Sequence, residues 1–109
     1  MTVKELTELT DFTVLALPCP ATQVEGCYIG DLLSWVMGRA SENNAWLTIM
    51  SNENVIAVAT LAGISAVILC ENVRPSDEMI RLASDKGVNL LVSSHPIYKT
   101  SLILSSLAI

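Results

Sequence analysis

Apolar positions along the chain fall into two kinds of run, short all-apolar segments typical of buried strands and longer segments at helical spacing. The clearest succession is a strand over Trp46–Met50, a helix over Asn54–Ala62 and a strand over Ala66–Cys70. Ser51–Asn54 supplies turn and helix-cap chemistry, and Gly63 ends the helix. Because the second strand has no polar side chain, we expect helices to cover both of its faces, as in a parallel sheet.

The chain before this unit is predicted to form a helix, a strand and a strand that turns directly into a helix. The first helix runs from Val3 to about Thr10, with Thr2 and Glu5 spaced as a capping box. The next strand covers Phe12–Leu17 and ends at two prolines, which cannot donate to a ladder. The segment Gly26–Met37 then turns at a glycine from a short strand into an apolar-striped helix.

The alternation continues to the end of the chain. A helix begins at Pro75 or Ser76 and stops at Gly87, a strand covers Val88–Val92, and a last helix runs from about Ile97 to Leu107. Strands that alternate with helices are joined by right-handed crossovers. The predicted fold class is therefore α/β, a three-layer αβα arrangement with a Rossmann-like parallel or mixed sheet.

Length and composition predict one domain over residues 1–109 with an unusually apolar surface. About half of the residues are apolar and only 16% are charged, so part of the outside is expected to be an interface. The net charge is −5 and the six basic residues are scattered singly, which argues against a nucleic-acid partner. The charge-free stretch from Asn54 to Cys70 is too short and interrupted for a membrane span.

The cysteines and the N-terminal segment indicate a chain that works in the cytoplasm. The first residues are acidic and lack the apolar core of a signal peptide. Cys19, Cys27 and Cys70 form no CxxC pair, and the chain has one histidine, so neither a zinc site nor another cofactor is expected. The thiols are interpreted as free cysteines in a reducing compartment.

Polar residues follow the predicted strands, at the edge where α/β sheets bind ligands. They form a polar and largely uncharged rim, suited to a small polar molecule, although helix caps and loops would use the same residue types. The rim candidates are Ser51, Asn52, Asn54, Glu71, Asn72, Ser93, Ser94 and His95.

The pair Gly30 and Asp31, and the rim residue His95, each allow more than one interpretation. Gly30 and Asp31 could bind an anion or a ligand hydroxyl, but capping of the following helix by the Asp31 carboxylate explains the pair by itself and is the favoured interpretation. His95 would need a positioned carboxylate or a second partner for a phosphoryl-accepting or acid–base role. Its sequence neighbours provide none, so its simplest place is the turn before the last helix, and no catalytic residue is assigned.

The run Gly26–Met37, together with Ala45–Ile49, Asn54–Ala59 and Ala66–Leu69, resembles the DRTGG domain family. The Asp-Arg-Thr part of the signature is absent, since Thr22–Glu25 stands in its place. The resemblance implies a stand-alone domain similar to the N-terminal domain of HPr kinase/phosphorylase, of a kind often encoded beside iron-only hydrogenase genes. It does not imply kinase activity, which belongs to a separate P-loop domain, and the chain contains no GxxxxGK[ST] motif.

These observations favour a non-catalytic regulatory or sensing domain that binds a small ligand, with an adenine nucleotide as one candidate. We expect a homodimer or a protein partner, because the helix Asn54–Ala62 has almost no polar face. The apolar last helix offers a second interface through Tyr98, Leu102, Ile103 and Leu104. The alternatives are a small phosphoryl- or acyl-transfer enzyme that needs a partner, and a structural adaptor without a ligand.

Overall fold

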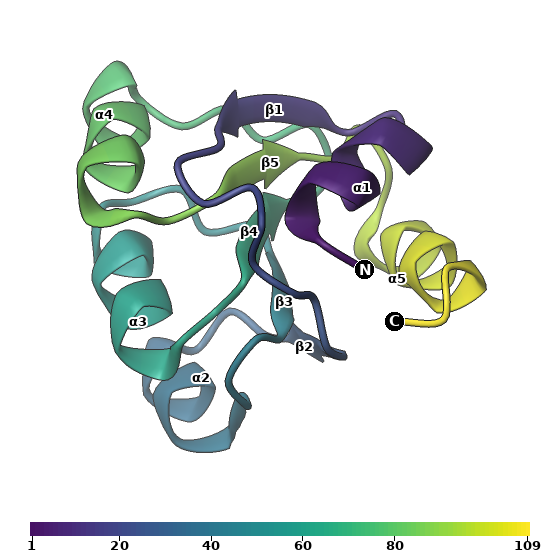
Figure 1. Ribbon diagram of the computed structural model, residues 1–109. Helices are drawn as coiled ribbons and strands as arrows, with labels where there is room; N and C mark the ends of the chain where they lie inside the picture. Colours follow the sequence, from purple (N-terminus) through teal and green to yellow (C-terminus); the bar gives the residue numbers. More distant parts are fainter.

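A computed structural model describes residues 1–109 and contains one mixed sheet of five strands in the order β1-β5-β4-β3-β2 (Figure 1). Four neighbouring strands, β2 to β5, are parallel, and β1 pairs antiparallel with β5 at one edge. This arrangement confirms the predicted α/β class with a mixed sheet. The strands are β1 (Thr13–Ala16), β2 (Cys27–Ile29), β3 (Ala45–Thr48), β4 (Ala66–Leu69) and β5 (Leu90–Val92).

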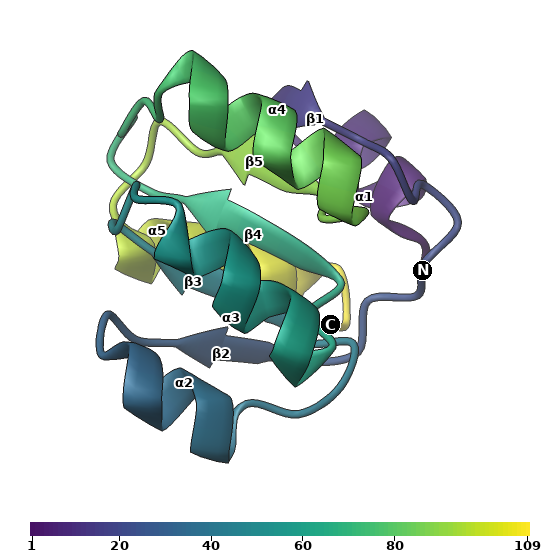
Figure 2. The same cartoon turned by 90° about the vertical axis from the view of Figure 1, so that its left-hand side faces the viewer.

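Helices cover both faces of the sheet, which confirms the three layers. They are α1 (Val3–Leu9), α2 (Leu33–Arg39), α3 (Asn54–Ala62), α4 (Asp77–Lys86) and α5 (Ile97–Ser106). The helices α2, α3 and α4 lie side by side on one face, while α1 and α5 lie on the other (Figures 1 and 2). No helix of the chain has both the length and the apolar character needed to cross a membrane.

Alternating side chains of the central strands fill two separate cores. On β3, Trp46 packs toward α2, α3 and α4, whereas Leu47 packs toward α1 and α5. On β4, Val67 and Ile68 divide in the same way. All four residues of β4 are buried, because both sheet faces are covered at the centre.

Local capping signals in the sequence were reliable at several helix ends. Thr2 and Glu5 form the predicted capping box, in which the Glu5 amide donates to Thr2 Oγ1 over 3.1 Å and the Thr2 amide donates to Glu5 Oε1 over 3.0 Å. Gly63 ends α3 with φ +69°, and Gly87 ends α4 with φ +74°. These left-handed conformations favour glycine because it has no Cβ.

Side-chain caps were expected at three further helix starts, and the structure has one at α3 but none at α2 or α5. The first residue before α2 is Leu32, which makes no capping bond, and Asp31 binds elsewhere. At α3 the position before the helix, Glu53, makes no cap bond, but Asn52, within the predicted cap segment Ser51–Asn54, accepts a hydrogen bond from the Asn54 amide through Oδ1 over 3.0 Å. Before α5 the cap position is Pro96, which makes no side-chain cap bond, and the Ser93 hydroxyl is paired with Thr100 Oγ1. The Oδ1 of Asp31 and the hydroxyl of Ser93 are instead bonded to the hydroxyls of Thr48 and Thr100.

The two helices predicted to be interfaces differ in how much apolar surface they leave exposed. In α3, Leu61 has 74% of its surface exposed and Ala57 is also exposed, so a single chain leaves part of this helix in water. In α5, Tyr98 and Leu102 are exposed, but Leu104 is buried in the core. Leu104 is therefore not available to an interface, contrary to the prediction.

Candidate functional site

The ten candidate residues lie at one edge of the sheet, because each follows the carboxyl end of a parallel strand. Since β1 is antiparallel, its first residues reach the same edge, beside the end of β5. We call this edge the rim and define it by the loops after β2, β3, β4 and β5 together with Asp11, which precedes β1. Hydrogen bonds join the loops in two pairs, the loops after β2 and β3, and the loops after β4 and β5.

In the first half of the rim, Asp31 links the ends of β2 and β3. Its Oδ1 accepts from the Thr48 hydroxyl over 2.6 Å and from the Ile49 amide over 3.1 Å. The carbonyl of Gly30 accepts from the indole of Trp46 over 2.9 Å. Gly30 and Asp31 thus hold the loop in place, while the second carboxylate oxygen, Oδ2, has no partner within the chain.

In the second half of the rim, two consecutive residues adopt the left-handed conformation although neither is glycine. Glu71 has φ +58° and Asn72 has φ +57°, a geometry that costs about 1–2 kcal/mol for an ordinary residue. Their amides donate to the carbonyls of His95, over 2.8 Å, and Ser93, over 2.9 Å. The loop after β4 is therefore fixed to the loop after β5 by its main chain.

His95 has a carboxylate partner that its sequence neighbours did not suggest. Its Nε2 lies 2.9 Å from Asp11 Oδ2 and 3.2 Å from Oδ1. The His95 amide donates to Ser93 Oγ over 3.2 Å, and that hydroxyl is paired with Thr100 Oγ1 over 2.8 Å in a buried position. Asp11 is separated from His95 by 84 residues, so only the direction of β1 brings the two together.

The rim is more acidic than the sequence analysis predicted. Asp11, Asp31, Glu53 and Glu71 are exposed there. The nearby cations are Lys99, in the first turn of α5, and Arg74, which donates to Asn72 Oδ1 through Nη2 over 2.9 Å. Among the remaining candidates, Ser51 is half-buried and the side chains of Asn52, Asn54 and Ser94 are exposed, whereas Ser93 is fully buried. Ser93 therefore supports the rim from beneath and cannot itself face a ligand.

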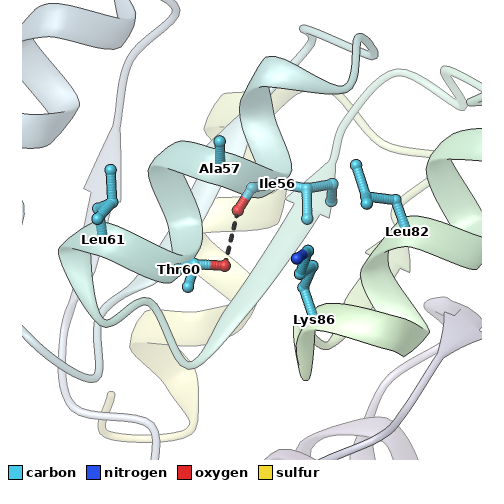
Figure 3. A pocket seen from close by; sticks show the side chains of 6 residues that line it. All are labelled: Ile56, Ala57, Thr60, Leu61, Leu82 and Lys86. Atoms are coloured by element: carbon cyan, nitrogen blue, oxygen red, sulfur yellow. Dashed lines mark hydrogen bonds between the residues drawn. The ribbon is translucent and has the colours of Figure 1, made fainter.

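An apolar groove lies away from the rim, between α3 and α4 (Figure 3). Its volume is about 270 Å³ and it is open to solvent on one side. The hydroxyl of Thr60 donates to the Ile56 carbonyl over 3.0 Å, so this polar group is already used. The lining residues are Ile56, Ala57, Thr60, Leu61, Leu82 and Lys86. The sequence predicted that α3 has almost no polar face, but it did not predict the groove.

Two thiols in the α1–α5 core are held in their protonated form. Burial, assisted by the nearby Cys70, raises the pKa of the Cys27 thiol to about 11. Burial also raises the pKa of Cys70 above its ordinary value. Both thiols are accordingly poor nucleophiles and poor metal ligands at neutral pH.

Comparisons with known proteins agree with this architecture. A family model described as the DRTGG domain matches residues 21–107. No curated protein matches the chain. Among solved structures, a similar fold is found in the CBS and DRTGG domains of the regulatory region of Clostridium perfringens pyrophosphatase, complexed with its activator, diadenosine tetraphosphate.

That structure and this chain are 12% identical in sequence, with a TM-score of 0.75. The match covers 94% of this chain and 45% of that chain, so the present chain spans less than half of the regulatory region's length. At this identity the likeness establishes a common fold.

Proposed function

The chain belongs to the DRTGG domain family, and on that premise we propose that it is a non-catalytic regulatory domain that binds a small ligand at the rim and passes the signal through an interface with a second copy. The observation that carries the proposal is the rim itself. Four loops and the start of β1 present carboxylates, amides and hydroxyls at one sheet edge. Ligands of α/β domains bind at this edge, where a few polar groups fix their orientation.

The ligand class that we propose is an adenine nucleotide. The regulatory region with the similar fold is described in complex with an activator that contains two adenosines. In the present chain, the exposed carboxylates of Asp31 and Glu71 suit ribose hydroxyls, and the exposed amide of Asn52 suits a base edge. Because the rim is acidic, the phosphates need the Arg74 guanidinium or the free amides at a helix start.

Thermal unfolding at fixed protein concentration tests the proposal. AMP, ADP, ATP, diadenosine tetraphosphate and coenzyme A are each added in excess. A ligand at one hundred times its Kd stabilises by about 2.7 kcal/mol, which raises Tm by roughly ten degrees or more in a domain of this size. The absence of a shift with every nucleotide would reject an adenine-nucleotide ligand.

Matched glutamate variants locate the binding site. Glu71→Gln changes the rim, whereas Glu8→Gln makes the same chemical change at an exposed position of α1. We expect E71Q to reduce the ligand-induced shift and E8Q to retain it in full. Equal shifts in both variants would place the ligand away from Glu71. Release of phosphate from ATP by the wild-type chain would favour the alternative of a small phosphoryl-transfer enzyme.

The interface that we propose is the groove face of α3 and α4. The helix α3 has no charged residue, and its exposed Leu61 stands beside the groove. Acidic side chains gather at the start of α3 and α4, at Glu53, Asp77 and Glu78, whereas the end of α4 carries Lys86 next to a single acidic residue, Asp85. An antiparallel pairing of two copies keeps these acidic ends apart and brings each toward a lysine, so a second copy is the partner that this face fits.

A further inference from the structure

The pair formed by His95 and Asp11 has a geometry that the proposed ligand-binding role does not use. An exposed ion pair contributes little to stability, and Asp11 has 62% of its side chain exposed. Yet the backbone of His95 is fixed on both sides, because its amide donates to Ser93 Oγ and its carbonyl accepts from the Glu71 amide. The imidazole is thus held in one place at the rim with 20% of its side chain exposed.

The contact with Asp11 determines which ring nitrogen can react. Since Nε2 lies 2.9 Å from a carboxylate oxygen, this nitrogen carries the ring proton and donates a hydrogen bond to Asp11. In that tautomer the lone pair is on Nδ1, and Nδ1 has no hydrogen-bond partner within the chain. A neutral imidazole with a free Nδ1 and an Nε2 held by a carboxylate is arranged as a nucleophile.

We propose that His95 is a phosphoryl-acceptor site, with Nδ1 as the attacking atom and an acyl phosphate as the donor. The Nδ1 lone pair attacks phosphorus and a nitrogen–phosphorus bond forms. The bond from phosphorus to the acyl oxygen breaks, and the carboxylate leaves with the bonding electrons. The Nε2 proton stays on the ring, where Asp11 balances the positive charge that develops, so no proton transfer or redox partner is needed.

Groups that stabilise the negative charge of a phosphoryl group lie next to His95 in the chain. The ten-residue helix α5 begins two positions after His95, and the amides of Ile97, Tyr98 and Lys99 donate no hydrogen bond within the chain. Lys99 also places an exposed cation in the first turn of α5. Helix-start amides and a lysine offset part of the negative field of Asp11 and Glu71. The proposal does not depend on nucleotide binding at the rim.

Incubation of the wild-type chain with acetyl phosphate tests the site, followed by intact-mass measurement and ³¹P NMR. The chain contains one histidine, so the phosphorus signal of a phosphohistidine has a unique assignment. We expect one phosphoryl group per chain, bonded to Nδ1, labile in acid and stable in base. His95→Gln abolishes the label. Acetylation of lysines adds a different mass and gives no phosphorus signal.

Asp11 acts as a positioning residue. Its test measures which ring nitrogen carries the phosphoryl group as well as the rate of labelling. Asp11→Asn keeps the shape but removes the charge that fixes the tautomer. We expect labelling to slow by roughly tenfold, less than in a buried catalytic pair because Asp11 is exposed. The product should also become a mixture of Nδ1 and Nε2 phosphohistidine. Glu8→Gln, a charge-neutralising change in α1, should label at the wild-type rate.

Several outcomes would overturn the proposal. They are the absence of any phosphohistidine in the wild-type chain, a wild-type product bonded through Nε2, and an acid-stable label that survives in H95Q. Unchanged rate and linkage in D11N would remove the positioning role of Asp11. A nucleotide-induced rise in Tm without phosphohistidine would reject this site and leave the ligand-binding proposal intact.

Discussion

At the scale of single residues, the carboxylate of Asp31 holds two strand ends together. Asp31→Ala leaves the buried hydroxyl of Thr48 and the Ile49 amide without their acceptor. We expect the free energy of unfolding to fall by about 1–3 kcal/mol, since an unpaired buried polar group costs about that much. Asp31→Asn retains an acceptor oxygen, so its free energy of unfolding should fall by less than half of the amount expected for Asp31→Ala. Urea unfolding measures both variants, and equal losses would contradict the bridging role.

A second residue-scale prediction concerns alkaline pH and Cys27. The folded chain keeps this thiol proton up to a pKa of about 11, whereas the unfolded chain loses it near the ordinary value of 9.0. Between these values the folded state binds more protons, so stability falls as pH rises. Because the Cys27 thiol is partly exposed, we expect the free energy of unfolding to fall by only about 1 kcal/mol between these two pH values.

Cys27→Ser removes this titration and provides the control. Unfolding free energies measured between pH 9 and pH 11 should decline less steeply in C27S than in the wild type, by the amount assigned to Cys27. Lysine and tyrosine titrate in the same range, but their contribution is common to both chains and cancels in the difference. Parallel curves for the two chains would contradict a raised pKa.

The contact between Asp11 and His95 could not be predicted from the sequence, although the need of His95 for a carboxylate could. A reactive role for His95 needs a carboxylate, and none stands among its neighbours in the sequence. The carboxylate lies 84 residues away. Whether Asp11 reaches His95 depends on β1 running antiparallel to β5, and the sequence left the sheet as parallel or mixed. Strand direction at an edge is a tertiary property that local patterns do not encode.

At the scale of helices, two glycines should respond to alanine with opposite signs. Gly38 lies within α2, and a Cβ there would meet no atom within 4 Å. Gly38→Ala should raise the free energy of unfolding by roughly 0.5–1 kcal/mol, because alanine restricts the unfolded chain and favours helix. Gly87 ends α4 with φ +74°, where Gly87→Ala should cost about 1–2 kcal/mol.

Steric space does not determine the effect of Gly87→Ala, so the comparison with Gly38→Ala is informative. A Cβ at Gly87 would lie 3.5 Å from the Cys19 sulfur, an ordinary contact. The expected loss in G87A therefore measures the left-handed conformation itself. Thermal unfolding of the two variants beside the wild type checks the signs. A stabilised G87A would mean that α4 ends differently from the structure described above.

Helix ends were predictable where one local signal acted alone. Thr2 with Glu5, Gly63 and Gly87 start or stop helices as expected, and Ser76 caps a helix that begins one residue later, at Asp77, because the partners of these residues lie close in the sequence. Asp31 failed as a cap because the buried Thr48 hydroxyl of a neighbouring strand took its oxygen. Rim residues are positioned by several loops at once, so their partners follow from the sheet and not from the adjacent sequence.

At the scale of the whole molecule, the fold was predictable because the central strands are buried on both faces. The all-apolar run of β4 required two covering layers, and the helices between strands supplied them. The rim position of the candidate residues followed from the same topology. The groove between α3 and α4 did not, because it depends on how two helices pack side by side. The apolar face of α3 is exposed to solvent, and packing within a single chain does not account for it.

We expect this face to join two copies of the chain at micromolar concentration. Leu61→Glu places a charge beside the groove, where an isologous contact would bury it, and should weaken self-association by roughly a hundredfold. Tyr98→Glu makes the matched change on α5, in the opposite layer, where the side chain is 75% exposed. Sedimentation equilibrium should find a dimer for the wild type and for Y98E, and a monomer for L61E. Dissociation by Y98E alone would move the interface to α5, and a monomeric wild-type chain would remove the dimer from the proposed function.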